Sequence, residues 1–147
     1  MSGGFQGGSR AQRRTTWRTP RYLFLQLDAE FGFTLDAAAC DESALAPTHI
    51  DISLDALEQP WPGVVFCNPP YGQREIPKWI LKGWNEAAKG STVVFLVPSR
   101  TDTTWWHDYA LRGEVRFIRG RLKFEGATNR APFPSAVIIF RPPGALR

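Results

Sequence analysis

Apolar runs alternate along the chain with segments whose apolar positions recur at helical spacing. The runs at 64–67 (VVFC), 91–99 (STVVFLVPS) and 135–140 (SAVIIF) do not alternate with polar residues. Such runs are typical of strands that are covered on both faces. Three further segments predict strands by a weaker pattern: 33–39 (FTLDAAA), which we expect to end at Asp36, 48–53 (THIDIS) and 114–120 (EVRFIRG).

Three segments predict helices. Leu23, Phe24, Leu27 and Phe31 lie on one helical face, which predicts a helix over about 20–30. A second face is formed by Ile76, Trp79, Ile80, Trp84, Ala87 and Ala88, with Pro77 near the start of the helix and Gly90 at its end. Segment 101–112 (TDTTWWHDYALR) predicts a third helix, capped by Thr101 or Asp102. A single helical turn and a proline-rich loop are expected over 54–63.

Strands that alternate with helices predict an α/β fold with a mostly parallel sheet. The last connection has no helical pattern, so the sheet is expected to end in an antiparallel pair. Residues 36–68 are too few for two full helix crossovers, and we expect one strand of the usual sheet to be missing or reduced. The chain of 147 residues fits one domain over 15–147, preceded by a disordered Gly/Ser/Arg-rich basic tail over 1–14.

Charge is unevenly distributed along the chain. Residues 1–21 hold five arginines and no acid, residues 22–99 hold ten acids against four bases, and residues 100–147 hold nine bases against four acids. Basic ends around an acidic centre favour a polyanionic partner, although a solvated basic tail with scattered surface arginines explains the charge alone equally well.

Other sequence features bear on the cellular setting. No apolar run approaches a membrane span, and the start of the chain lacks the apolar region of a signal peptide. We therefore expect a soluble, cytoplasmic protein. Cys40 and Cys67 are too few for a metal site or a disulfide framework, so both are expected to be reduced thiols, and no metal is expected.

The strand at 64–67 is followed at once by Asn68, Pro69, Pro70 and Tyr71. In open α/β sheets, ligands bind at the carboxyl ends of the strands. The Asn68 amide oxygen and the Pro69 carbonyl are two fixed acceptors that suit a group with two N–H donors, such as an exocyclic amine. Tyr71 offers a flat face on which a planar ring can stack.

This segment resembles the motif of amino-group methyltransferases, (Asp/Asn/Ser)-Pro-Pro-(Tyr/Phe/Trp). The order of WRTPRYLFLQL, FGFTLDAAA, NPPYG, VPSRTDTTWWH, RGRLKF and APFPSAVIIF resembles the phage-type DNA N6-adenine methyltransferases from Trp17 to Phe140. An isolated NPPY would be less specific, because glutamine and RNA methyltransferases also carry it. The resemblance implies a Rossmann-like fold with a terminal antiparallel strand, S-adenosylmethionine as methyl donor, and a phage or prophage origin in a bacterial host.

The resemblance also implies roles for particular residues. Thr19 and Pro20 match the segment that contacts the methionine part of the donor, and Asp36, Ala37 and Ala38 match the turn after the first strand, where a carboxylate can pair with the donor's ammonium. The catalytic loop is matched by Asn68, Pro69, Pro70 and Tyr71, and Asn68 also borders the donor.

The chain departs from many such enzymes at the turn after the first strand. It reads LDAAACDES, with no glycine, and small alanines are expected to serve in place of the usual glycines. Asp51 or Asp55 is expected to contact the donor's adenosine, and the sequence does not choose between them.

The aromatic residues outside the motif have structural interpretations. Trp79 and Trp84 are expected to pack in the core, and one of Trp105 and Trp106 is expected to face the site. His107 is more typical of a satisfied polar residue than of a base.

An adenine within a duplex cannot reach a recessed loop, so the target base is expected to flip out of double-stranded DNA onto Tyr71. The polar loop 120–135 places Arg121, Lys123 and Arg130 around Phe124 and Phe133, and is a candidate for nucleic-acid binding, as are Arg13 and Arg14 of the tail. The interpretation of 120–135 as a surface loop anchored by its phenylalanines carries equal weight.

With no room for a recognition domain, we expect relaxed sequence preference or help from homodimerisation. The alternatives to adenine methylation are an inactive nucleic-acid-binding module with this fold, or methylation of cytosine N4 or of protein glutamine.

Overall fold

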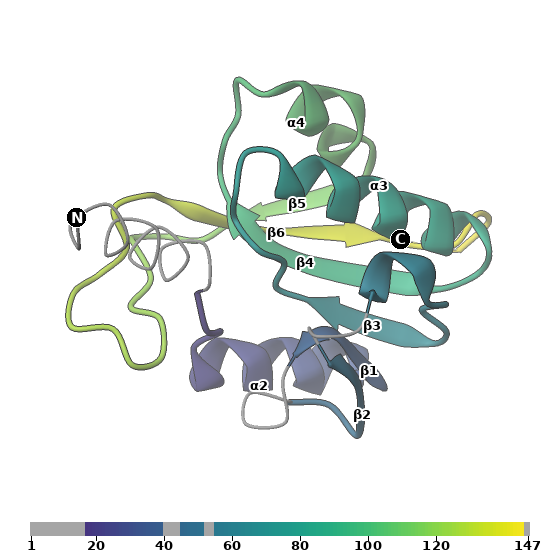
Figure 1. Ribbon diagram of the computed structural model, residues 1–147, viewed down its shortest axis with the longest axis horizontal. Coiled ribbons are helices and arrows are strands. Elements are labelled where there is room, and N and C mark those ends of the chain that lie inside the picture. Colours follow the sequence, from purple (N-terminus) through teal and green to yellow (C-terminus); the bar gives the residue numbers. More distant parts are fainter. Residues whose placement is uncertain (1–16, 40–44, 52–54, 146–147) are drawn as a thin grey trace, which may run out of the picture.

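The computed structural model describes residues 17–39, 45–51 and 55–145, and every structural statement refers to these residues. The tail 1–14 predicted to be disordered, including Arg13 and Arg14, lies outside them, as does Cys40. In chain order the elements are α2 (Arg21–Phe31), β1 (Leu35–Ala39), β2 (Thr48–Asp51), η1 (Ala56–Glu58), β3 (Val64–Cys67), α3 (Glu75–Ala88), β4 (Thr92–Pro98), α4 (Thr104–Asp108), η2 (Ala110–Arg112), β5 (Glu114–Phe117) and β6 (Ser135–Phe140) (Figure 1).

The six strands form one mixed sheet in the order β2-β1-β3-β4-β6-β5. The four strands from β2 to β4 in this order are parallel, whereas β6 runs antiparallel to both β4 and β5. The α/β class, the mostly parallel sheet and the antiparallel end are thereby confirmed. Eight residues separate β1 from β2, too few for a helical crossover, which agrees with the predicted reduction of the sheet.

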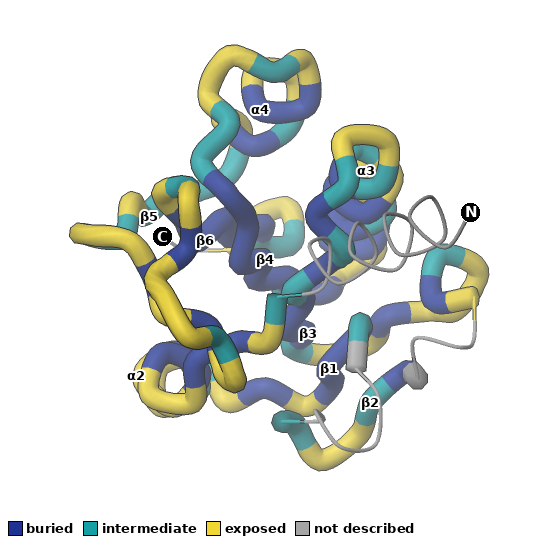
Figure 2. Tube along the Cα trace, turned by 60° about the vertical axis from the view of Figure 1, so that its left-hand side comes forward, coloured by how far each residue is buried: buried dark blue, intermediate teal, exposed yellow. Residues whose placement is uncertain are grey.

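Helices cover both faces of the sheet, with α2 on one side and α3 on the other (Figure 1). Successive strand residues point to opposite faces. Phe66 of β3 accordingly packs edge-on against Phe24 of α2, while Phe95 of β4 contacts Trp61 and Phe140 on the α3 side. Burial on both faces explains why β4 and β6 consist almost entirely of buried residues (Figure 2).

Helix α3 packs closely on β4 because Gly83 has no side chain. A Cβ at this position would lie 2.3 Å from Cε2 of Phe95, well inside contact distance. The same helix buries Trp79 against Trp61 and places Trp84 against Phe140, so both tryptophans pack in the core as predicted.

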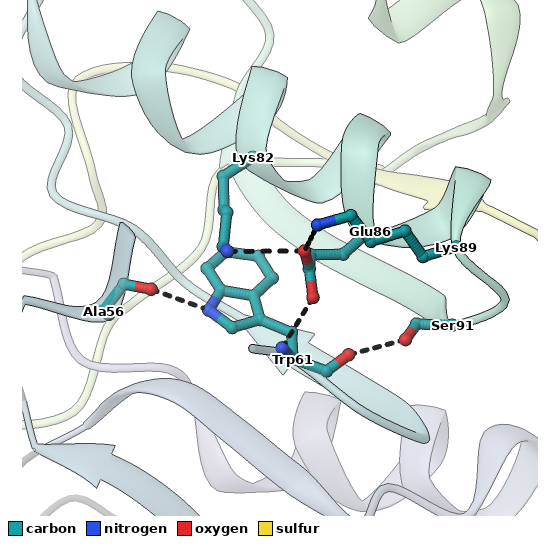
Figure 3. A network of polar contacts seen from close by, with 6 residues as sticks. All are labelled: Ala56, Trp61, Lys82, Glu86, Lys89 and Ser91. Atoms are coloured by element: carbon teal, nitrogen blue, oxygen red, sulfur yellow. Dashed lines mark hydrogen bonds and ion pairs between the residues drawn. The ribbon is translucent and has the colours of Figure 1, made fainter. Parts of the chain in front are cut away.

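A buried carboxylate ties α3 to the segment before β3 (Figure 3). Glu86 Oε1 accepts a hydrogen bond of 2.7 Å from the Trp61 backbone N–H, and its Oε2 lies 3.3 Å from Lys82 Nζ and 3.1 Å from Lys89 Nζ. The Ser91 hydroxyl, just before β4, donates to the Trp61 carbonyl. Burial opposes ionisation of Glu86, but the bonds from Trp61, Lys89 and Lys82 outweigh it and lower the pKa of the carboxyl.

Two predictions about elements are wrong in detail. Asp36 is the second residue of β1 and does not end it, because the strand continues through the alanines to Ala39. The third helix, α4, is only five residues long, and its N-cap is Thr103 in place of Thr101 or Asp102. It ends because the backbone of Tyr109 leaves the helical conformation, and η2 follows.

No helix in the described part of the chain is long and apolar enough to cross a membrane.

Candidate active site

The site lies where the strand order reverses direction. Strand β2 pairs with one edge of β1, and β3 pairs with the other edge of β1. Ligands of open α/β sheets bind at the carboxyl ends of strands at such a switch point. Asp36 of β1 pairs in register with Phe66 of β3, and Asn68 follows two residues later. Both polar side chains line the same pocket.

Asn68 is held in one orientation by the segment before α2. Its amide nitrogen donates to the Trp17 carbonyl and, over 3.0 Å, to Thr19 Oγ1. Two acceptors on this side require the nitrogen to face them, which directs Oδ1 the other way. Oδ1 is buried and has no hydrogen-bond partner. An unpaired buried acceptor is rare in native proteins, which makes Oδ1 a candidate acceptor for a donor group of a ligand.

Asp36 is a buried carboxylate, 4% exposed, that lines the pocket. Its oxygens accept long hydrogen bonds from the backbone N–H groups of Ala38, at 3.4 Å, and Leu45, at 3.3 Å. Burial raises the pKa of Asp36 to about 6, against the lowering effect of these bonds and of His49. A cationic ligand group beside Asp36 would restore the charged form, which fits the ammonium of an amino-acid moiety.

We expect Asp36→Ala to weaken S-adenosylmethionine binding by about 1.5 to 3 kcal/mol, because a charge-assisted bond is lost. Since the pKa of Asp36 in the free protein is about 6, the wild type should bind the donor about tenfold more weakly at pH 5 than at pH 7. Calorimetry at the two pH values measures both effects.

Asp36→Asn is the control for this pH dependence, because its side chain does not titrate. The affinity of this variant should be the same at pH 5 and pH 7. Unchanged donor affinity in Asp36→Ala would remove Asp36 from the site.

The pocket brings together most of the residues predicted for donor and catalysis: Thr19, Asp36, Ala38, Asn68, Pro69 and Pro70. It also contains four residues that the sequence did not single out: Trp17, Arg18, Leu45 and Phe66. Of these four, Trp17 could have been found from the sequence, because it is the first residue of the motif WRTPRYLFLQL.

Four predicted residues do not line this pocket. Pro20 is buried at the N-cap of α2, and Ala37 is completely buried within β1. Asp55 is exposed before η1. Tyr71 is the fourth. The side chain of Asp51, at the end of β2, lies outside the described residues.

Tyr71 is buried, with 3% of its surface exposed, and its hydroxyl donates to the Leu96 carbonyl over 3.0 Å. Its ring packs edge-on against Phe124 and Phe133, and Trp17 contacts the same two phenylalanines. This placement differs from the open stacking platform expected from the sequence, because the loop after β5 covers the ring in this conformation.

The loop after β5 is tied to the start of α2. Glu125 N–H donates to the Arg18 carbonyl, and Glu125 Oε1 accepts from the first N–H of the helix, at Arg21, over 2.7 Å. Arg121, Lys123 and Arg130 are exposed on the loop, and Arg130 donates to the Arg121 carbonyl. Phe124 is buried and Phe133 half-buried. The phenylalanines thus anchor the loop while its cations face solvent.

The remaining sequence candidates have structural roles. Trp105 and Trp106 are both buried, and Trp105 also lines a cleft beside α4, so the expectation that one of them faces the site stays a prediction. His107 Nε2 forms a hydrogen bond of 2.8 Å with the Thr101 carbonyl, as expected of a satisfied polar residue. Cys67 is a free, buried thiol.

The sheet order, the antiparallel end and the Asn-Pro-Pro-Tyr segment at the switch point are typical of the Rossmann-like methyltransferase fold. A family model for DNA N-6-adenine-methyltransferase (Dam) matches residues 7–142, and the chain belongs to this family. The match confirms the resemblance found in the sequence and implies S-adenosylmethionine as donor and DNA as substrate. Searches of curated proteins and of solved structures gave no significant match.

Proposed function

We propose that this chain transfers a methyl group from S-adenosylmethionine to the N6 amine of adenine in DNA. The observation that carries the proposal is the Asn68 side chain, whose oxygen is buried, unpaired and fixed by the bonds that hold the amide nitrogen. An exocyclic amine supplies the N–H donor that this oxygen lacks.

The reaction needs little acid–base chemistry from the protein. S-adenosylmethionine supplies an electrophilic methyl group on a positively charged sulfur. Asn68 Oδ1 and the Pro69 carbonyl accept the two N–H groups of the amine and direct its lone pair toward the methyl group. Positive charge then develops on N6, and both acceptors stabilise it. As N6 bonds to the methyl carbon, the methyl–sulfur bond breaks and S-adenosylhomocysteine leaves. The proton on N6 then passes to water, so no general base is required.

The donor fits the residues around the pocket. Asp36 would pair with the ammonium of the donor, while Thr19 and Ala38, which line the same pocket, would border the methionine part. Pro20 and Ala37 would support this wall from behind, and either Asp51 or Asp55 would contact the adenosine. Calorimetric titration tests this step, because an inactive nucleic-acid-binding module would show no heat of donor binding.

Access to Tyr71 requires a conformational step. The ring is covered by Phe124 and Phe133, so a flipped adenine can stack on it only after the loop 120–134 shifts. The cations Arg121, Lys123 and Arg130 on this loop would bind the DNA backbone, which would couple DNA binding to exposure of the ring. A homodimer would enlarge this DNA-binding surface.

The basic tail is proposed as a second DNA contact, through Arg13 and Arg14. We expect replacement of Arg10, Arg13 and Arg14 by alanine to lower DNA affinity and to reduce the slope of log K against log salt by about 2 to 3, because up to three phosphate contacts are lost. Donor affinity should not change. Fluorescence anisotropy at several salt concentrations provides the measurement, and an unchanged slope would show that the tail is only a solvated arm.

Methylation of cytosine N4 or of protein glutamine uses the same acceptor chemistry. Digestion of treated DNA to nucleosides separates these alternatives from adenine methylation, because each modified product has its own mass.

A further inference from the structure

Four buried side-chain polar atoms in the described residues lack a hydrogen-bond partner: Asn68 Oδ1, Ser99 Oγ, Arg100 Nη1 and Ser135 Oγ. All four lie at one end of the sheet. Asn68 follows β3, and Ser99 and Arg100 follow the parallel neighbour β4. Ser135 begins the antiparallel strand β6, opposite Pro98. Buried polar atoms are normally paired, so this cluster marks a place where a ligand completes the bonds.

The one cation in this cluster is Arg100. Its backbone is fixed by a turn in which the Arg100 carbonyl accepts from the Thr103 N–H and, over 2.7 Å, from the Thr103 hydroxyl. Burial and the neighbouring Cys67 raise the pKa of Tyr71, and the positive charge of Arg100 opposes this shift. The turn therefore fixes the backbone of Arg100, and its charge lies near Tyr71 of the Asn-Pro-Pro-Tyr segment.

Arg100 also lines a cleft of about 570 Å³ that is distinct from the donor pocket. The cleft lies between Gln73 and Pro77, just after the catalytic loop, and the segment from Arg100 to Tyr109. Its volume is within the range of sites for small organic ligands. Asn68, Pro69 and Pro70 of the catalytic loop line the donor pocket, whereas Gln73, two residues after that loop, lines this cleft.

We propose that Arg100 contacts the target nucleotide, donating from Nη1 to an acceptor atom that is either a phosphate oxygen or a ring nitrogen of the base. This inference rests on the proposed function. Asp102 and Asp108 also line the cleft, but both are exposed and neither forms an ion pair with Arg100 among the described residues. Nη1 of Arg100 is thus available to an acceptor, while Asn68 would bind the donor group of the same nucleotide.

The first experiment compares Arg100→Gln with Arg112→Gln. Arg112 is the matched control, because it lies over Trp84 at the opposite end of the sheet. Sites are mapped by sequencing DNA treated with the wild type, and kcat and KM are measured on a duplex with one such site. We expect Arg100→Gln to lower kcat/KM for DNA at least about tenfold, as for loss of a charged hydrogen bond, with donor affinity unchanged. Arg112→Gln should match the wild type.

The second experiment uses the wild-type protein, so it does not depend on the folding of a variant. One duplex carries neutral methylphosphonates flanking the target adenosine, and others replace N1, N3 or N7 of the target adenine by carbon. A loss of about tenfold in kcat/KM with one of these duplexes identifies the acceptor, and Arg100→Gln should show no further loss with that duplex.

The outcomes separate the two proposals. A wild type that methylates no DNA would refute the proposed function and this inference with it. If the wild type is active and Arg100→Gln has the same kcat/KM for DNA as Arg112→Gln, the role of Arg100 is refuted while the proposed function stands. The same conclusion would follow if every modified duplex reacted like the unmodified one.

Discussion

Asn68→Ala is expected to reduce kcat for DNA methylation by about a hundredfold or more, with little change in donor affinity or in the free energy of unfolding. The Asn68 oxygen meets the amine as positive charge develops, so its bond strengthens toward the transition state. Removing one such preorganised group costs about two orders of magnitude in typical enzymes. Steady-state kinetics with saturating donor measure the effect, which should appear in kcat more than in KM.

Asn68→Asp is the companion variant. A carboxylate accepts the same N–H groups, so this variant should keep measurable activity where alanine does not. It should remain below the wild type, because a carboxylate cannot donate to the Trp17 carbonyl as the Asn68 amide does. Full activity in Asn68→Ala, or equal inactivity of the two variants in folded protein, would contradict the acceptor role of Asn68.

Glu86→Ala is expected to destabilise the fold by about 3 to 5 kcal/mol, the range for breaking a buried ion pair. The change leaves the buried Trp61 N–H without an acceptor and Lys82, whose side chain is 15% exposed, without a counterion. This loss is a large share of the stability of a typical domain, about 5 to 15 kcal/mol. Urea unfolding at pH 7 measures it.

Glu75→Ala is the matched control on the same helix. Glu75 pairs with Lys78 at 3.5 Å, but both side chains are well exposed, so its loss should cost less than about 1 kcal/mol. Equal stability of the two variants would contradict the structural role of Glu86.

The contribution of Glu86 to stability should depend on pH, because the pKa of its carboxyl is lowered in the folded protein. This contribution is present above the unfolded pKa near 4.5 and is lost as the pH falls through the folded pKa.

Strands with purely local signals could be predicted from the sequence. The bounds of β3 and β6 agree with the apolar runs VVFC and SAVIIF, because turn-forming or polar residues flank a continuous buried segment. The helix α4 was predicted too long, since its pattern of buried residues continues through Ala110 although the backbone changes at Tyr109. Local periodicity does not distinguish a continuous helix from two short turns.

The location of the pocket was predictable, but its contacts were not. The position of Asn68 after β3 and the switch-point rule predicted a ligand site there, and Asn68 lines a pocket at that point. The partners of its amide, Trp17 and Thr19, lie about 50 residues earlier in the chain. The burial of Tyr71 depends on Phe124 and Phe133, which lie more than 50 residues later. Such contacts follow from tertiary packing, which sequence periodicity does not encode.

The most direct test is to incubate the purified chain with unmethylated DNA and S-adenosylmethionine, digest the DNA to nucleosides and analyse them by mass spectrometry. We predict N6-methyldeoxyadenosine in the wild-type reaction and a yield at least about a hundredfold lower with Asn68→Ala. N4-methyldeoxycytidine as the product, or no methylated nucleoside from folded protein that binds the donor, would contradict adenine methylation.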